Sequence, residues 1–196
     1  MIKEFKMTRS EMIKINIEYM LKYVGKFLNI AIDSWPIILL LIGSSIVVMV
    51  LYEKITKCKV SIYRKVIIII STVYVWALMY MAIGARRIGS VRNIDFIPFN
   101  EEGGFVYIVF YATINLLIFL PLGMLLPELF RKMRKLKNTV WVGFGVSMFI
   151  EIAQYVLACG DSQTEDIIMN ALGCYVGYKL WNVFDKKRVH KQHSNV

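Results

Sequence analysis

Long apolar segments alternate with short polar links along most of the chain. We place the apolar segments at residues 35–52, 66–85, 105–126, 140–158 and 166–184. Each is close to the length that a helix needs to cross the roughly 30 Å hydrocarbon core of a bilayer. The pattern predicts an all-α integral membrane protein with about five transmembrane helices in one bundle.

Residues 1–34 have a different pattern. Apolar side chains recur at helical spacing, but Lys14, Glu18 and Lys22 lie between them. So many charges oppose a membrane crossing, and we predict an amphipathic helix that lies in the membrane interface. A helix packed on the protein's own inner face is the alternative. The chain thus divides into an amphipathic N-terminal segment (1–34), a transmembrane domain (35–184) and a basic tail (185–196).

Composition and charge agree with a membrane location. Apolar residues make up 57% of the chain and the mean hydropathy is +0.54. The net charge of +10 comes from Lys and Arg in the links and the tail, where positive-inside topology and anionic lipid headgroups explain it without nucleic acid.

The same charges predict the orientation. The links at 53–65 and 127–138 and the C-terminal tail are basic and are therefore expected in the cytoplasm. The links at 86–104 and 159–164 then face outward. Five crossings also place the N-terminus outside despite its lysines. Either the first helix lies on the outer leaflet, or residues 13–34 form a sixth crossing.

Polar side chains inside the apolar segments are the main functional lead. An acid at membrane depth costs several kcal/mol unless it is paired or lines a cavity. If the third to fifth segments pack together, their polar residues form a pocket open to the outer side, with arginines above it. The pocket residues would be Asn115, Glu151, Gln154, Asp166 and Asn170, and the arginines Arg86, Arg87 and Arg92.

A purely structural role is the alternative interpretation of these residues. Intramembrane amides often only join neighbouring helices, and Asp166 suits the N-terminal turn of a helix. Glu151 and Asp166 are the candidate general acid and base of an enzyme. A depth difference of roughly 10 Å between them, from the rise of a helix, opposes direct cooperation unless a cavity joins them.

Other chemistry is poorly represented. Both histidines, His190 and His193, lie in the basic tail. The cysteines Cys58, Cys159 and Cys174 match no zinc or redox spacing. We therefore expect no metal site and no cofactor.

Small residues predict where helices approach each other. Gly173 and Gly177 form a GxxxG face, and Gly143 with Ser147 forms a similar pair in the preceding segment. We expect these faces to pack the fourth and fifth segments together. Use of the Gly173/Gly177 face in an oligomer is the alternative.

Four spaced motifs carry a family resemblance. They are Ile97–Phe99 (IPF), Asn115–Gly123 (NLLIFLPLG), Ser147–Gln154 (SMFIEIAQ) and Asp166–Tyr178 (DIIMNALGCYVGY). In this order, over roughly residues 86–180, the chain resembles the VanZ-like family of small bacterial membrane proteins, named for a member tied to teicoplanin resistance. Asn115, Pro121, Gly123, Glu151, Gln154, Asp166, Asn170, Gly173, Gly177 and Tyr178 fall on the family's pattern.

The chain also departs from that pattern. Relatives commonly carry an Arg and further acids in the turn before the last segment, whereas residues 160–166 here read GDSQTED. Asp95 stands where an Asn usually precedes IPF. A role of the turn arginine in binding an anion would here fall to Arg86, Arg87 or Arg92, or be missing.

The resemblance implies a protein that lowers susceptibility to teicoplanin-type lipoglycopeptides, with membrane lipids, the drug or a lipid-linked cell-wall precursor as partners. Two other functions stay open. One is a small membrane enzyme that modifies a lipid-linked envelope substrate. The other is an accessory subunit whose polar residues only hold helices together.

Overall fold

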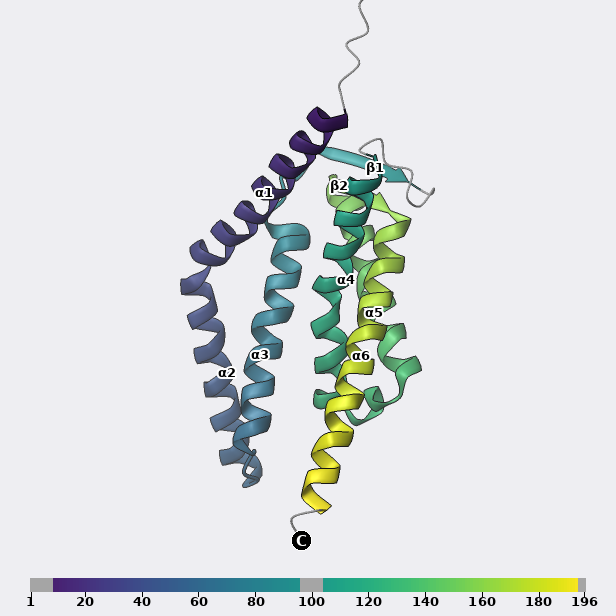
Figure 1. Ribbon diagram of the computed structural model, residues 1–196. Helices are drawn as coiled ribbons and strands as arrows, with labels where there is room; N and C mark the ends of the chain where they lie inside the picture. The colour runs from purple at the N-terminus through teal and green to yellow at the C-terminus, as the bar shows by residue number, and fades with distance from the viewer. Residues whose placement is uncertain (1–8, 96–103, 194–196) are drawn as a thin grey trace, which may run out of the picture.

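The computed structural model describes residues 9–95 and 104–193, and the IPF motif lies outside these ranges. The described residues form helices joined by short links, with one pair of short strands (Figure 1). The α-helices are α1 (Arg9–Asp33), α2 (Trp35–Thr56), α3 (Ile62–Met79), α4 (Gly104–Leu129), α5 (Leu136–Leu157) and α6 (Thr164–His193). The strands are β1 (Val91–Asp95) and β2 (Cys159–Gln163).

The prediction of an all-α membrane protein is confirmed. In the described part of the chain, four helices are long and apolar enough to cross a membrane: α2, α3 with the turn that follows it, α4 and α5. The predicted fifth segment is helical as well. Its helix α6 is more polar and is not among those four, but it runs beside α4 and α5 through the bundle (Figure 1). The protein is an all-α multi-pass membrane protein.

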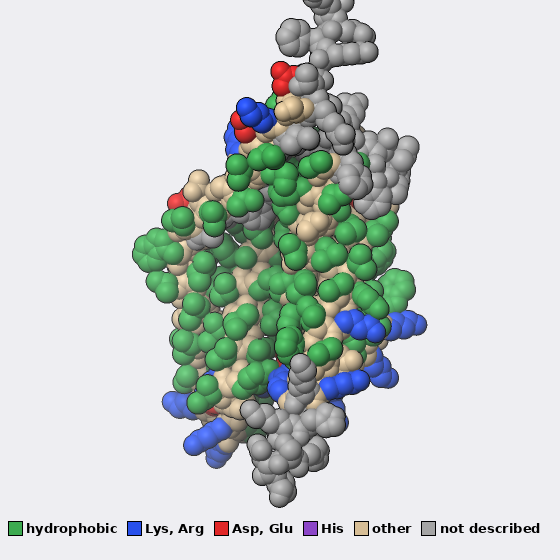
Figure 2. All heavy atoms as spheres, in the orientation of Figure 1, with side chains coloured by type: hydrophobic (Ala, Val, Ile, Leu, Met, Phe, Trp, Pro, Cys, Tyr) green, Lys and Arg blue, Asp and Glu red, His purple; other side chains and the backbone are tan. Residues whose placement is uncertain are grey.

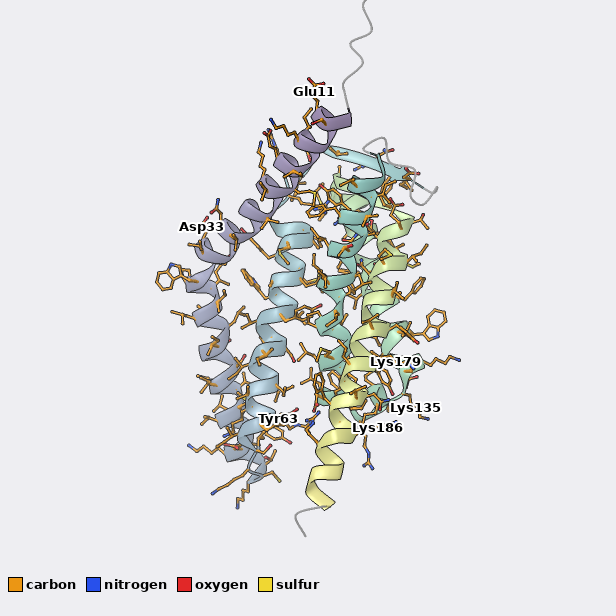
Figure 3. All side chains as sticks on the ribbon, in the orientation of Figure 1. Glu11, Asp33, Tyr63, Lys135, Lys179 and Lys186 are labelled. Carbon is orange, nitrogen blue, oxygen red and sulfur yellow. The ribbon has the colours of Figure 1, made fainter. Side chains whose placement is uncertain are left out.

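The two ends of the bundle differ in character. We call the end that carries β1 and β2 the strand end, and the opposite end the basic end. Lys and Arg gather toward the basic end on the face in Figure 2. Lys135, Lys179 and Lys186 lie toward that end in Figure 3, and Glu11 and Asp33 mark the ends of α1 near the other. This segregation is what the charge pattern predicts for cytoplasmic and outer faces.

Helix α1 lies obliquely over the strand end rather than alongside the other helices (Figure 1). Ser34 separates it from α2, and Pro36 occupies the first turn of α2, where its missing N–H costs nothing. Leu21, Leu28 and Ile32 of α1 are exposed, and α1 is not among the helices apolar enough to cross a membrane. An interfacial helix is consistent with these observations.

The links at 86–104 and 159–164 each contain a short strand that the sequence analysis did not predict. Val91–Asp95 and Cys159–Gln163 pair as parallel strands, with Val91 opposite Cys159 and Asp95 opposite Gln163. The sequences VRNID and CGDSQ show no apolar alternation, so the strands could not be recognised. Their pairing joins the start of α6 to the link that follows α3.

Glycines fix the packing of α6. The carbonyl oxygens of Leu116 and Leu120, on α4, lie where side chains at Gly173 and Gly177 would stand. The Gly173/Gly177 face therefore packs on α4, not on α5 as expected, and α4 covers the face that an oligomer would have used. Gly143 of α5 does meet α6, where it makes room for the Cys174 side chain. Close backbone approach of this kind is how small residues join helices in lipid.

Helices α2 and α3 form a hairpin beside the α4–α6 unit (Figure 1). Leu78 of α3 joins the buried core with Phe119, Leu122, Ile150 and Cys174. The Tyr74 hydroxyl donates to the carbonyl oxygen of Ile118 at 2.8 Å. Below this point, toward the basic end, an apolar cleft of about 390 Å³ separates α3 from α4. The hairpin is thus attached to the α4–α6 unit above this cleft by Leu78 and Tyr74, and below it by the bond from Arg188 to the Tyr63 hydroxyl.

Candidate functional site

Polar side chains from α4, α5 and α6 and from the link after α3 meet in a cavity in the strand-end half of the bundle. Its volume is about 60 Å³, enough for a few water molecules at roughly 30 Å³ each. The predicted residues Arg86, Asn115, Glu151, Gln154, Asp166 and Asn170 all line it, together with Leu78, Met81, Ala82, Ile118, Phe119 and Ile150.

Asn115 and Asp166 join α4 to α6. The Asn115 amide nitrogen donates to Oδ1 of Asp166 across the two helices. Asp166 also lies in the first turn of α6, where the helix dipole favours an acid. The amide contact and the helix-end position both favour an acidic residue at this place in the cavity wall.

Glu151 is the most enclosed acid of the cavity, with 6% of its surface exposed. Its Oε2 accepts a hydrogen bond from the backbone N–H of Gln163 at 3.1 Å. Gln163 ends β2, so the strand pair positions the carboxylate. Glu151 and Asp166 line the same cavity, which supplies the connection that the depth argument required.

Arg86 is the arginine that reaches the cavity. Its Nη1 lies where a side chain at Gly160 would stand, and Oε1 of Gln154 lies 3.4 Å from that same position. Gly160 belongs to the stretch in which relatives carry the turn arginine. The missing side chain at Gly160 therefore makes room for a guanidinium supplied from a different link.

Arg87 and Arg92 do not line this cavity. The Arg92 guanidinium lies over the Tyr155 ring, 5.7 Å from its centroid, and donates to the carbonyl oxygen of Val156 at 3.3 Å. Arg87 is exposed, and its carbonyl oxygen accepts from the Ser90 hydroxyl at 2.6 Å. Of the three predicted arginines, only Arg86 belongs with the buried acids.

Gln154 connects the site to α3. It is 3% exposed, and its amide nitrogen donates to the carbonyl oxygen of Ala82 at 3.0 Å. Ala82 lies in a π-helical turn, Tyr80–Gly84, that directly follows helix α3. Such turns are frequent at functional sites because they leave backbone groups free for other partners.

The contribution of α3 was missed in the sequence. Leu78, Met81 and Ala82 line the cavity, but only the third to fifth apolar segments were expected to form it. These side chains are apolar and carry no chemical signal.

Asn170 has one unsatisfied group. Its Nδ2 donates to the Ser147 hydroxyl of α5 at 2.8 Å. Its Oδ1 is buried and accepts no hydrogen bond, and Asn170 lines the cavity. A buried acceptor without a donor costs about 1–3 kcal/mol, so a water or a ligand N–H or O–H placed there would be stabilised.

The chemistry of the site is that of hydrogen bonding and charge. Within the described ranges no group of three His, Cys, Asp or Glu side chains could hold a metal ion. Carboxyl groups, amides and one guanidinium line a small space between the helices. The fold and site define a multi-pass membrane protein with a small polar cavity in one half of the bundle.

Comparison with known proteins identifies the family of this chain. Residues 65–185 match the model of the VanZ/LLP1 family, and the chain belongs to that family. The match begins within α3, so it includes the helix that completes the cavity. The chain is also similar to the protein VanZ of Enterococcus faecium, with 30% identity over 105 residues, 54% of this chain and 62% of that protein. The chain thus matches less than two thirds of that relative's length. No solved structure matches the chain.

Proposed function

We propose that this protein lowers susceptibility to teicoplanin-type lipoglycopeptide antibiotics from the bacterial plasma membrane, with the strand end facing outward. Family membership and the similarity to VanZ support the phenotype. The larger number of Lys and Arg residues at the opposite end, in the links at 53–65 and 127–138 and in the last turns of α6, supports the orientation.

The polar cavity is the proposed point of action. The single observation that carries this proposal is the convergence of Arg86, Glu151 and Asp166 with three amides around one space. Burying a carboxyl side chain such as Glu151, which is 6% exposed, in a membrane protein is costly. Helix association alone would need only the amides, whereas binding of a polar ligand group uses the charges as well.

The size of the cavity limits what it binds. About 60 Å³ admits one small polar group, far less than the 300–1,000 Å³ of a pocket for a drug-sized ligand. A lipoglycopeptide or an envelope component would therefore lie over the strand end and insert a hydroxyl, amine or amide N–H. The free acceptor of Asn170 and the carboxylates favour such a hydrogen-bond donor.

Susceptibility assays in a teicoplanin-sensitive bacterial host test the proposal. Glu151→Gln and Asn170→Ala should restore sensitivity when membrane levels match those of the unaltered protein. Glu18→Gln makes the same chemical change as Glu151→Gln at an exposed position of α1 and should leave resistance unchanged. Unaltered resistance in both cavity variants would remove the cavity from the mechanism. Loss of resistance only through lower abundance would favour an accessory or structural role.

The meeting of Glu151 and Asp166 in one cavity also supports a second function, acid–base catalysis on a lipid-linked envelope substrate. Mass spectrometry of cell-wall precursors separates the two. An enzyme changes the mass of a precursor in cells that express the protein, and Glu151→Gln abolishes the change. A binding protein leaves all precursor masses unaltered.

A further inference from the structure

A second hollow lies on the other side of Glu151. It is an apolar groove of about 310 Å³ between the strand-end halves of α5 and α6, next to the strand pair. Ile94, Met148, Ile152, Tyr155, Gln163 and Ile167 line it. Glu151 lines both the groove and the polar cavity, and its bond to the Gln163 N–H forms the partition between them.

The groove opens to the surroundings of the bundle. Ile152 is 57% exposed and Tyr155 39%, and both lie on the apolar helix α5, which is suited to cross a membrane. An apolar groove at this position faces hydrocarbon rather than water. Its volume falls within the range of pockets that hold small molecules, so one hydrocarbon chain is the natural occupant.

Charged side chains near the groove indicate which lipid headgroup would fit there. The Arg92 guanidinium lies over the ring of Tyr155, a residue that lines the groove, at 5.7 Å from the ring centroid. Arg is suited to phosphate because its planar fork donates two parallel hydrogen bonds. Asp95 also lines the groove and accepts from hydroxyl or ammonium groups. The rim thus fits a phosphate that carries a hydrogen-bond donor beyond it.

We propose that the groove binds one chain of an anionic phospholipid from the strand-end leaflet, with its phosphate against Arg92 and its headgroup hydroxyls toward Asp95. The bound lipid places its headgroup at the partition formed by Glu151. Any effect of this lipid on antibiotic susceptibility rests on the proposed function, but the binding itself does not.

Site-specific photocrosslinking tests the lipid site. The full chain is placed in nanodiscs of equal parts phosphatidylglycerol and phosphatidylcholine with identical acyl chains. A benzophenone group replaces either Ile152, in the groove, or Phe149, an exposed residue of the same helix that does not line the groove. Mass spectrometry of the adducts then reports which lipid each position touches.

The Ile152 position should capture phosphatidylglycerol in excess over phosphatidylcholine, and the Phe149 position should capture both in the bulk ratio. Arg92→Gln should reduce the excess by about fivefold, the effect of one basic residue near an anionic lipid. Arg87→Gln, an exposed arginine outside the groove, should leave it unchanged.

Equal capture of both lipids at Ile152, or crosslinks from Ile152 only to protein, would overturn the proposal. The outcome is separable from the resistance assay. If Glu151→Gln abolishes resistance while no phosphatidylglycerol excess is found, the cavity function stands and the lipid site is rejected. If the excess is found but Glu151→Gln keeps resistance, the lipid site stands and the cavity function is rejected.

Discussion

Asn170 of α6 donates from Nδ2 to the hydroxyl of Ser147 on α5 at 2.8 Å, while its own Oδ1 stays buried without a donor. The bond crosses between the two helices that β2 connects. The same amide therefore joins the bundle through one atom and faces the cavity with the other. The hydrogen bond to Ser147 stabilises the fold, whereas the buried acceptor without a donor destabilises it. Separate experiments can measure these two effects.

The Asn170–Ser147 bond should contribute a small coupling to stability. In a double-mutant cycle of Asn170→Ala and Ser147→Ala, we expect a coupling of about 0.6–2 kcal/mol, the range for interhelical hydrogen bonds in membranes. Unfolding of the purified protein by SDS in mixed micelles measures it. Removing Asn170 also removes an unsatisfied acceptor, so the single variant should lose little stability. Zero coupling would mean that the bond does not form.

Gly177→Ala should separate α4 from α6. Its new methyl group would meet the Leu120 carbonyl oxygen, with the Gly123 Cα only 3.1 Å away. Both neighbours are backbone and have no alternative rotamer, so we expect a loss of about 1–3 kcal/mol in SDS unfolding.

Gly145→Ala is the matched control for Gly177→Ala. Gly145 is also within a helix, but nothing lies within 4 Å of the added methyl group. The higher helix propensity of Ala should leave stability unchanged or raise it by up to about 1 kcal/mol. Equal losses in the two variants would contradict the packing of α6 on α4.

A charged cluster at the basic end should hold α3, α4 and α6 together. Glu128 accepts from the Trp181 indole at 2.9 Å and from Arg188, and Arg188 donates to the Tyr63 hydroxyl at 2.5 Å. The Arg188 side chain is 42% exposed, which weakens the pair. Arg188→Gln should therefore cost about 1–2 kcal/mol in SDS unfolding.

Lys186→Gln serves as the control for Arg188→Gln because Lys186 is an exposed cation two residues away on the same helix. It should change the free energy of unfolding by less than about 0.5 kcal/mol. If both variants lose the same stability, net charge at this end matters and the cluster does not.

A native cysteine can report the orientation of the chain. Cys58 is exposed and lies at the basic end, while Cys159 and Cys174 are buried. A membrane-impermeant maleimide should label Cys58 only after the cells are permeabilised, because the positive-inside rule places this end in the cytoplasm. In a Cys58→Ser background, Ser90→Cys at the exposed strand end should be labelled in intact cells. The reverse pattern would invert the topology.

The helices were predictable from the sequence because apolar length is a strong signal in a membrane protein. The expected boundaries at Trp35, near residue 105 and near residue 158 agree with α2, α4 and α5. The strand pair was not predictable, since its two five-residue strands are about 70 residues apart and neither alternates. Their pairing depends on the helices that bring the links together.

The polar side chains of the site were predictable, but their arrangement was not. A carboxylate in an apolar segment is visible in any sequence, so Glu151 stood out. Which arginine reaches the acids depends on Gly160, where a missing side chain admits Arg86. The apolar wall supplied by α3 gave no signal, because Leu78 and Met81 resemble any other membrane-facing residues.

The π-helical turn after α3 has a mechanical consequence. Gln154 holds this turn through the Ala82 carbonyl oxygen, and α3 supplies one wall of a cavity with room for only a few waters. The walls from α4 and α6 are locked by backbone contact at Gly173 and Gly177, and α5 is locked to α6 at Gly143. The wall from α3 is held instead by side-chain hydrogen bonds, from Gln154 to the Ala82 carbonyl oxygen and from Tyr74 to the Ile118 carbonyl oxygen. A larger group in the cavity would therefore displace α3 more easily than the other three helices.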